Sequence, residues 1–264
     1  MTAKDPINAD IEQMMGLPFG REPRVYSSSL ADRLKAVFRH SPAHKLFTSY
    51  LDIMPGGGAE AFYYEPFHAI FLESMPENKE MLYHIEAHER THAFASQFMR
   101  NGLPGFWKCM SMDKAHLMRH SADLMLLHYV REGLAEYVAL SLLKRKFGEH
   151  GYFIDEVARK EDILRNSVQG GADNAETLAG WKRASAAIMG LYVNLNLPGA
   201  FKAGGKRLSE VHSVIKSLSY TLGYYGMETY FRGETENIGE KAVALMANMP
   251  KGFPELHELI TAGQ

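Results

Sequence analysis

The spacing of apolar residues changes near residue 76, where a strand-like pattern gives way to a helical one. Before it, the stretches 46–54 and 61–72 are rich in aromatic and β-branched residues, and glycines separate them. This composition predicts strands joined by a loop. A further turn at Glu65 and Pro66 predicts that 61–72 forms a hairpin.

Beyond residue 76, apolar residues recur at the three- and four-residue spacing of amphipathic helices. Segments rich in glycine and proline separate the helical stretches. One earlier stretch has the same spacing and begins with three serines, which suit a helix N-terminus. The expected helices span 27–40, 77–100, 122–147, 154–166, 175–195, 208–231 and 238–249.

The fold class that follows is α+β and mainly helical. The chain has 264 residues, of which 46% are hydrophobic and 23% charged, as in ordinary globular proteins. Single cores stop growing near roughly 250 to 300 residues, so one domain can hold the whole chain. We expect one domain with a small β-containing lobe at 1–101 and a helical lobe at 102–264.

Charge and cysteine content exclude several classes of protein. The formal net charge is −2, so no global basic field draws the chain to nucleic acid or to a membrane surface. The single cysteine, Cys109, excludes an intramolecular disulfide and a multi-cysteine zinc cluster. No apolar run has the length of a signal peptide or a membrane span. We expect a soluble, cytoplasmic protein, although leaderless export leaves no trace in a sequence.

The chemistry of the chain centres on His88, Glu89 and His92 within the expected helix 77–100. Four-residue spacing places the two histidines about 40° apart around a helix and about 6 Å apart along it, so both can reach one ion. Glu89 lies about 60° from His92, close enough to take a proton from a water that zinc has acidified. The alternative is that the histidines only line a buried helix face.

A zinc hydrolase needs a third protein ligand and one open coordination position. Ala95 and Phe98 occupy the places where a third histidine would extend the motif. The expected helix 122–147 offers Glu132 and Glu136 instead, on one face at four-residue spacing. A ligand imidazole also needs an acceptor for its other N–H group, which a second carboxylate can provide.

The segment from His88 to His92, followed by Glu-Gly-Leu-Ala-Glu at 132–136, resembles the gluzincin group of zinc metallopeptidases, which includes thermolysin and the large aminopeptidases. The resemblance implies a zincin-like fold and one Zn²⁺ per chain, held by His88, His92 and Glu132. It also implies that Glu89 is the general base. Glu136 then stands where this group has an acid that hydrogen-bonds a ligand histidine.

The interval between the two motifs departs from the group. Between His92 and Glu132 stand 39 residues, more than is usual in its best-known members. An inserted helix around 108–118 would fill this interval. No particular family within the group is assigned.

Further candidates flank these motifs. His84 and His128 precede a ligand by one turn, and we expect them to support the site because the ligand set is already full. In gluzincins a tyrosine or histidine of the helical lobe commonly stabilises the oxyanion, and here Tyr220 and Tyr224 are candidates, with His212 in reserve. The alternative is that these tyrosines only pack a helix interface.

The sequence therefore predicts a zinc metallopeptidase acting on a peptide or protein substrate, with endopeptidase and aminopeptidase activity both open. A zinc amidase or deformylase is one alternative, although deformylases with this motif use a cysteine before it and Cys109 comes after. The other is a non-catalytic interaction protein whose helices are braced by zinc or hold no metal at all. Such a protein has no need of Glu89, which favours catalysis.

Overall fold

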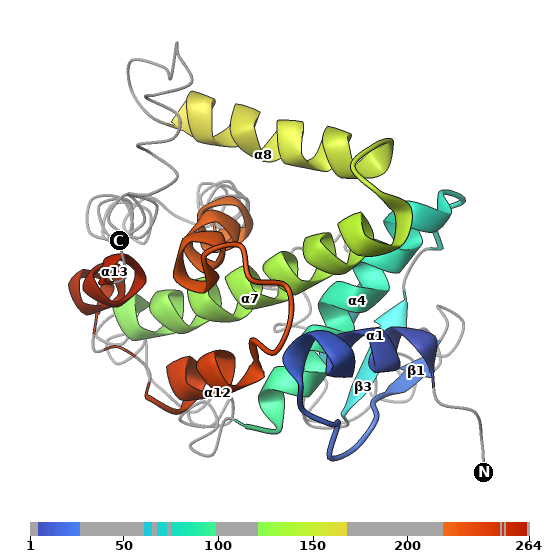
Figure 1. Cartoon of the computed structure of the whole chain (residues 1–264), viewed down its shortest axis with the longest axis horizontal. Coiled ribbons are helices and arrows are strands. Elements are labelled where there is room, and N and C mark those ends of the chain that lie inside the picture. The colour runs from blue at the N-terminus through green and yellow to red at the C-terminus, as the bar shows by residue number, and fades with distance from the viewer. Residues whose placement is uncertain are drawn as a thin grey trace, which may run out of the picture.

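The computed structural model of the chain describes residues 5–26, 61–64, 68–72, 75–98, 121–167, 219–248, 250 and 252–262. In these residues the chain is mainly helical, with one small sheet (Figure 1). The helices expected at 27–40 and 175–195 and the strand expected at 46–54 lie outside the described residues.

The sheet has three short strands in the order β1-β3-β2. Strands β2 (Ala61–Tyr64) and β3 (Ala69–Leu72) are antiparallel, which confirms the hairpin predicted within 61–72. Strand β1 (Arg24–Tyr26) pairs with β3 in parallel and was not predicted. Among the described strands, β2 is therefore an edge strand.

Three long helices fall where the apolar spacing predicted them. They are α4 (Lys79–Ser96), α7 (Ser121–Phe147) and α8 (Tyr152–Ser167). Asn78 caps the N-terminus of α4: its side chain accepts hydrogen bonds from the backbone N–H groups of Glu80 and Met81. Helix α7 ends with three basic residues, which complement the negative end of its dipole.

The C-terminal part is also helical. Residues 219–231 are helical, within the helix predicted at 208–231, and α12 (Gly239–Ala247) matches the next prediction. The helices α1 (Pro6–Met15) and α13 (Phe253–Thr261) were not predicted. None of the helices in the described ranges combines the length and apolar character needed to cross a membrane.

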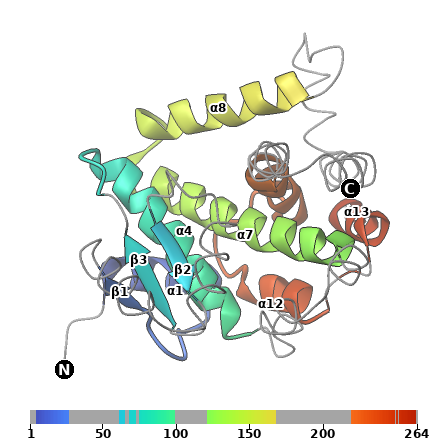
Figure 2. The same cartoon turned by 180° about the vertical axis from the view of Figure 1, so that it is seen from behind.

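Helix α7 runs through the middle of the molecule, with α8 on one side of it and α12 on the other (Figures 1 and 2). Helix α4 packs along α7, and α1 covers α4. One buried apolar cluster joins these helices to the C-terminal ones, and its largest members include Phe94, Tyr129, Tyr225 and Phe231. The two expected lobes thus share one core, and the face where α4 meets α7 carries the motif residues.

Candidate metal centre

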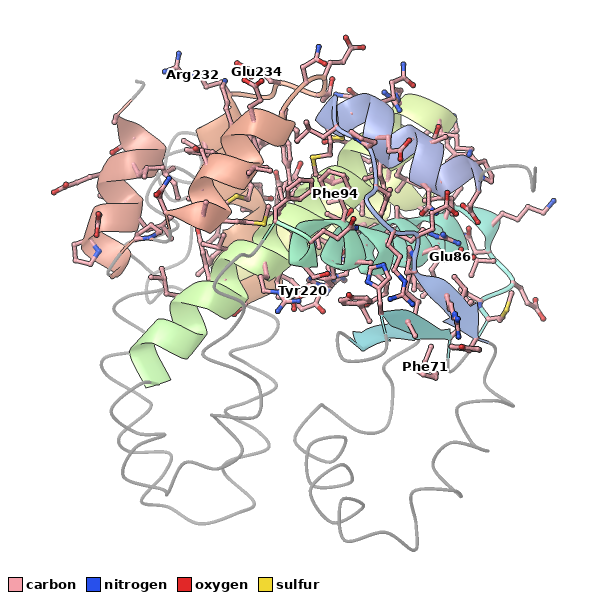
Figure 3. All side chains as sticks on the ribbon, turned by 90° about the horizontal axis from the view of Figure 1, so that it is seen from below. Phe71, Glu86, Phe94, Tyr220, Arg232 and Glu234 are labelled. Atoms are coloured by element: carbon pink, nitrogen blue, oxygen red, sulfur yellow. The ribbon has the colours of Figure 1, made fainter. Side chains whose placement is uncertain are left out.

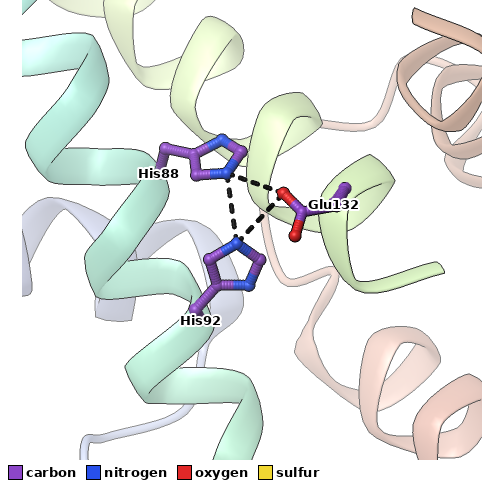
Figure 4. A group of neighbouring side chains, drawn as sticks. All are labelled: His88, His92 and Glu132. Atoms are coloured by element: carbon purple, nitrogen blue, oxygen red, sulfur yellow. Dashed lines mark hydrogen bonds and ion pairs between the residues drawn. The ribbon is translucent and has the colours of Figure 1, made fainter. Parts of the chain in front are cut away.

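The packing of α4 against α7 brings His88, His92 and Glu132 together (Figure 4). His88 Nε2 lies 3.1 Å from Glu132 Oε2, and His92 Nε2 lies 3.3 Å from the same oxygen. The two Nε2 atoms are 3.1 Å apart. All three residues are buried, and one ligand atom of each lies within 4.8 Å of the others.

These distances fit a tetrahedral metal ion. Zinc binds histidine nitrogen and carboxylate oxygen at roughly 2.0–2.2 Å, and a tetrahedron of that size sets neighbouring ligand atoms about 3.3 Å apart. The three measured distances of 3.1, 3.1 and 3.3 Å lie close to this value. Two imidazole nitrogens and a carboxylate oxygen also bring lone pairs together, an arrangement that only a shared cation or proton can stabilise.

Glu136 contacts one of the candidate ligands. Its Oε2 lies 2.9 Å from His88 Nδ1, on the far side of the ring from the ligand atom. A hydrogen bond donated by Nδ1 leaves the Nε2 lone pair directed at the metal position. The residue predicted to orient a ligand histidine therefore contacts one in the structure.

Charged neighbours set the pKa values of His88 and Glu136. Burial by itself lowers the pKa of His88, but the hydrogen bonds with Glu132 and Glu136 outweigh it and raise this pKa to about 10. Burial likewise acts to raise the pKa of Glu136, yet the Lys160 ammonium and His84 hold it well below its usual range. Without a metal, His88 is therefore an imidazolium at neutral pH while Glu136 is a carboxylate. A cation bound at Nε2 takes the place of the proton on that nitrogen.

Glu89 is held by the sheet. Its Oε2 accepts a hydrogen bond from the backbone N–H of Tyr63, at 2.6 Å. The side chain of Tyr63 reinforces the contact, because its hydroxyl lies 2.9 Å from Ser96 Oγ in the last turn of α4. Edge strand β2 thus lies directly against the predicted general base.

Of the two candidate tyrosines, Tyr220 lies beside the candidate ligands. Its ring stacks on His88 with the centroids 5.1 Å apart and the planes 3° from parallel, and its hydroxyl hydrogen-bonds Glu132. Figure 3 shows Tyr220 where the helical segment 219–231 passes α7 and α4. The hydroxyl of Tyr224 instead donates to Glu228, at 3.3 Å. Tyr220 is therefore the better candidate for an oxyanion donor.

The ionisation of Tyr220 suits a donor. Burial and the neighbouring carboxylates of Glu132 and Glu89 raise its pKa well above the ordinary value for tyrosine. The phenol therefore keeps its proton across the physiological range. A protonated hydroxyl next to the ligands can donate to a negative charge that develops there.

A pair of glycines lets Tyr220 come this close. A Cβ on Gly133 would lie 2.6 Å from the carbonyl carbon of Gly223, and a Cβ on Gly223 would lie 2.7 Å from the Gly133 Cα. Helix α7 and the segment 219–231 therefore touch backbone to backbone one residue after Glu132. The Tyr129 hydroxyl, which donates to the Leu222 carbonyl at 2.8 Å, adds a hydrogen bond at the same crossing.

The remaining predicted residues differ in their position. His84 contacts Glu136, which itself contacts His88. Its Nε2 lies 3.3 Å from Glu136 Oε1 and its Nδ1 lies 3.2 Å from the Tyr152 hydroxyl. The side chain of His128 and all of His212, Cys109 and 108–118 lie outside the described residues.

Sequence reasoning missed Lys160, which is fully buried and pairs with Glu136 at 2.6 Å. A signal for it exists in the sequence. Glu156 and Lys160 stand eight and four residues before the buried Leu164, so a charged pair occupies the apolar face of α8.

Comparison of the chain with protein-family models, with curated proteins and with solved structures found no match.

Proposed function

We propose that the chain is a gluzincin-like zinc metallopeptidase that hydrolyses peptide bonds. The observation that carries the proposal is the convergence of His88 Nε2, His92 Nε2 and Glu132 Oε2 at 3.1–3.3 Å. Two histidines and a glutamate are the zinc ligands of thermolysin-type sites, and three protein ligands leave a fourth position for water or substrate. A zincin-like fold belongs to the same proposal.

His88, His92 and Glu132 would hold the zinc ion, with Glu136 orienting His88. When bound, the ion supplies a Lewis acid that polarises the substrate carbonyl and lowers the pKa of water toward 7. The rest of the chemistry is assigned to side chains of the chain itself.

Glu89 would act as general base and then as general acid. Its carboxylate takes a proton from the attacking water as the water oxygen bonds to the carbonyl carbon. The same proton passes to the departing amine nitrogen when the carbon–nitrogen bond breaks. The hydrogen bond from the Tyr63 N–H limits the rotation of the Glu89 side chain, which keeps the base in place between these two transfers.

Tyr220 would stabilise the oxyanion of the tetrahedral intermediate. Its phenol is protonated and hydrogen-bonded to Glu132, so its hydroxyl lies beside the ligand set. Stacking on His88 limits the movement of the ring. To donate to the oxyanion, the O–H would rotate away from Glu132 while the stacked ring stays in place, so little reorganisation is needed when the negative charge forms.

The edge strand supports a peptide as substrate. Strand β2 ends the sheet among the described strands and contacts Glu89 through its backbone. An extended peptide can add to such an edge through main-chain groups of β2 other than the Tyr63 N–H, which donates to Glu89, and this would place its backbone next to the base. A small amide has no extended backbone that could form these main-chain hydrogen bonds.

The test compares zinc content and hydrolysis of a mixed peptide library in wild type, Glu89→Gln and Glu132→Ala. We expect one zinc per wild-type chain and cleaved peptides. Glu89→Gln should keep zinc and lose activity by about 10²–10⁴-fold, the range for removing a general base. Glu132→Ala should lose zinc. A suitable control is Glu86→Gln, an acid on the same helix that pairs with Arg90.

Each competing function has its own outcome. A wild type that binds zinc and cleaves small amides but no peptide in the library would identify an amidase. Zinc binding that stabilises the fold without any hydrolysis would identify a zinc-braced protein. Zinc bound equally tightly by Glu132→Ala would refute the ligand set.

A further inference from the structure

A buried lysine lies behind the proposed metal centre. Lys160 of α8 has no exposed surface, and its Nζ is 2.6 Å from Glu136 Oε1 and 3.1 Å from Glu156 Oε1. Burying an ammonium group is unfavourable unless it is paired, and an apolar residue would pack α8 at lower cost. The charge at this position therefore calls for an explanation beyond packing.

The two oxygens of Glu136 connect Lys160 to a metal ligand. Oε1 faces the ammonium of Lys160, while Oε2 faces Nδ1 of His88 at 2.9 Å. The opposite nitrogen of the same ring is one of the three converging ligand atoms. An unbroken series of short contacts thus runs from α8 through α7 to the ligand face of α4.

Glu136 has few ways to keep this orientation without Lys160. The carboxylate is almost completely buried, and its other contact on the Lys160 side is His84 Nε2 at the longer distance of 3.3 Å. The nearby carboxylate of Glu156 repels it. An ammonium on Oε1 therefore both balances the charge of the carboxylate and leaves Oε2 directed at His88.

We propose that Lys160 is a positioning residue of the metal centre, which acts through Glu136 to hold His88 in the orientation that binds the ion. The inference rests on the proposed function, because it assumes that His88 is a metal ligand. It extends the site to α8, a helix that contributes no metal ligand. A purely structural lysine would tie α8 to α7 without affecting the metal.

The test is a double-mutant cycle on zinc affinity, measured by competition with a chromophoric chelator. We expect Lys160→Met to bind zinc about tenfold more weakly and Glu136→Gln about 10–100-fold more weakly, the range for outer partners of ligand histidines. The double variant should bind zinc less than twofold more weakly than Glu136→Gln alone, because the effect of Lys160 passes through the Glu136 carboxylate. Lys160→Arg, which keeps the charge, should stay within about threefold of wild type.

Two further comparisons separate this role from stability. Lys241→Met removes a lysine that pairs with Glu234 on the surface, and it should leave zinc affinity unchanged. If Lys160→Met does not fold, Lys160→Gln answers the same question, since it keeps donors without the charge. Its zinc affinity should also fall about tenfold, again only where Glu136 is present.

Several results would overturn the proposal. Unchanged zinc affinity in a folded Lys160→Met or Lys160→Gln variant, or an equal loss with and without Glu136, refutes the positioning role while the metal centre stands. A wild type that binds no zinc refutes both the role and the proposed function. The two failures are thus distinguishable in one set of measurements.

Discussion

Gly133→Ala tests how closely helix packing controls the site. The added Cβ would lie 2.6 Å from the carbonyl carbon and oxygen of Gly223, closer than non-bonded atoms approach. Because the obstacle is backbone, α7 and the segment 219–231 must separate. Such overpacking costs about 1–3 kcal/mol, whereas alanine gains about 1 kcal/mol in helix propensity over glycine, so we expect a net loss of about 0–2 kcal/mol.

The effect on activity should be larger than the effect on stability. Tyr220 lies on the segment that must move, and its stacking on His88 depends on that segment's approach. A displacement of about 1 Å at a catalytic group can cost about 10²-fold in rate. We expect Gly133→Ala to remain folded and to bind zinc, with kcat reduced by about that factor.

Urea unfolding and peptide hydrolysis measure the two effects separately. Gly252→Ala is the matched control, because its added Cβ would meet only Pro254 Cδ at an ordinary 3.6 Å, on extended backbone that alanine also adopts. Wild-type kcat in Gly133→Ala would show that the glycine crossing does not position Tyr220. A variant that fails to fold would show that the clash costs more than about 2 kcal/mol net.

Three other predictions address the metal and the tyrosine. Because the pKa of His88 is raised to about 10 without metal, zinc must displace its proton, and zinc affinity should rise about tenfold per pH unit from pH 6.5 toward 10. Calorimetry in buffers of different ionisation enthalpy should detect about one proton released on zinc binding. A zinc affinity that does not change with pH contradicts this prediction. Tyr220→Phe keeps the ring but not the donor, so steady-state kinetics should show kcat falling about 10²–10³-fold with zinc affinity almost unchanged. In Tyr224→Phe, kcat should stay within about threefold of wild type. A chelator should lower the melting temperature of wild type, since zinc at about 1,000 times its Kd adds roughly 4 kcal/mol, but should leave that of Glu132→Ala unchanged.

Short elements show where sequence patterns lose information. The long helices α4, α7 and α8 repeat their apolar spacing over several turns and were predicted. Strand β1 has three residues, too few for an alternating pattern to stand out. Helix α1 was missed although it has start and stop signals, an Asp5 cap and Gly16 in the left-handed conformation at its end.

What the sequence determined by itself is the chemistry that depends on local geometry. His88, Glu89 and His92 share one helix, so their spacing follows from its pitch alone. Glu132 and Glu136 follow the same rule on α7. In both cases neighbouring residues in the chain decide which side chains share a face, and no tertiary contact is needed.

Only the tertiary structure decided how these faces meet. The distance from Glu132 to the histidines depends on the packing of α4 against α7, and the choice of Tyr220 over Tyr224 depends on the crossing of Gly133 and Gly223. The contact of Lys160 with Glu136 depends on where α8 folds back. Such distances are set by side-chain volumes and backbone approach between segments far apart in the chain, which periodicity along one segment does not contain.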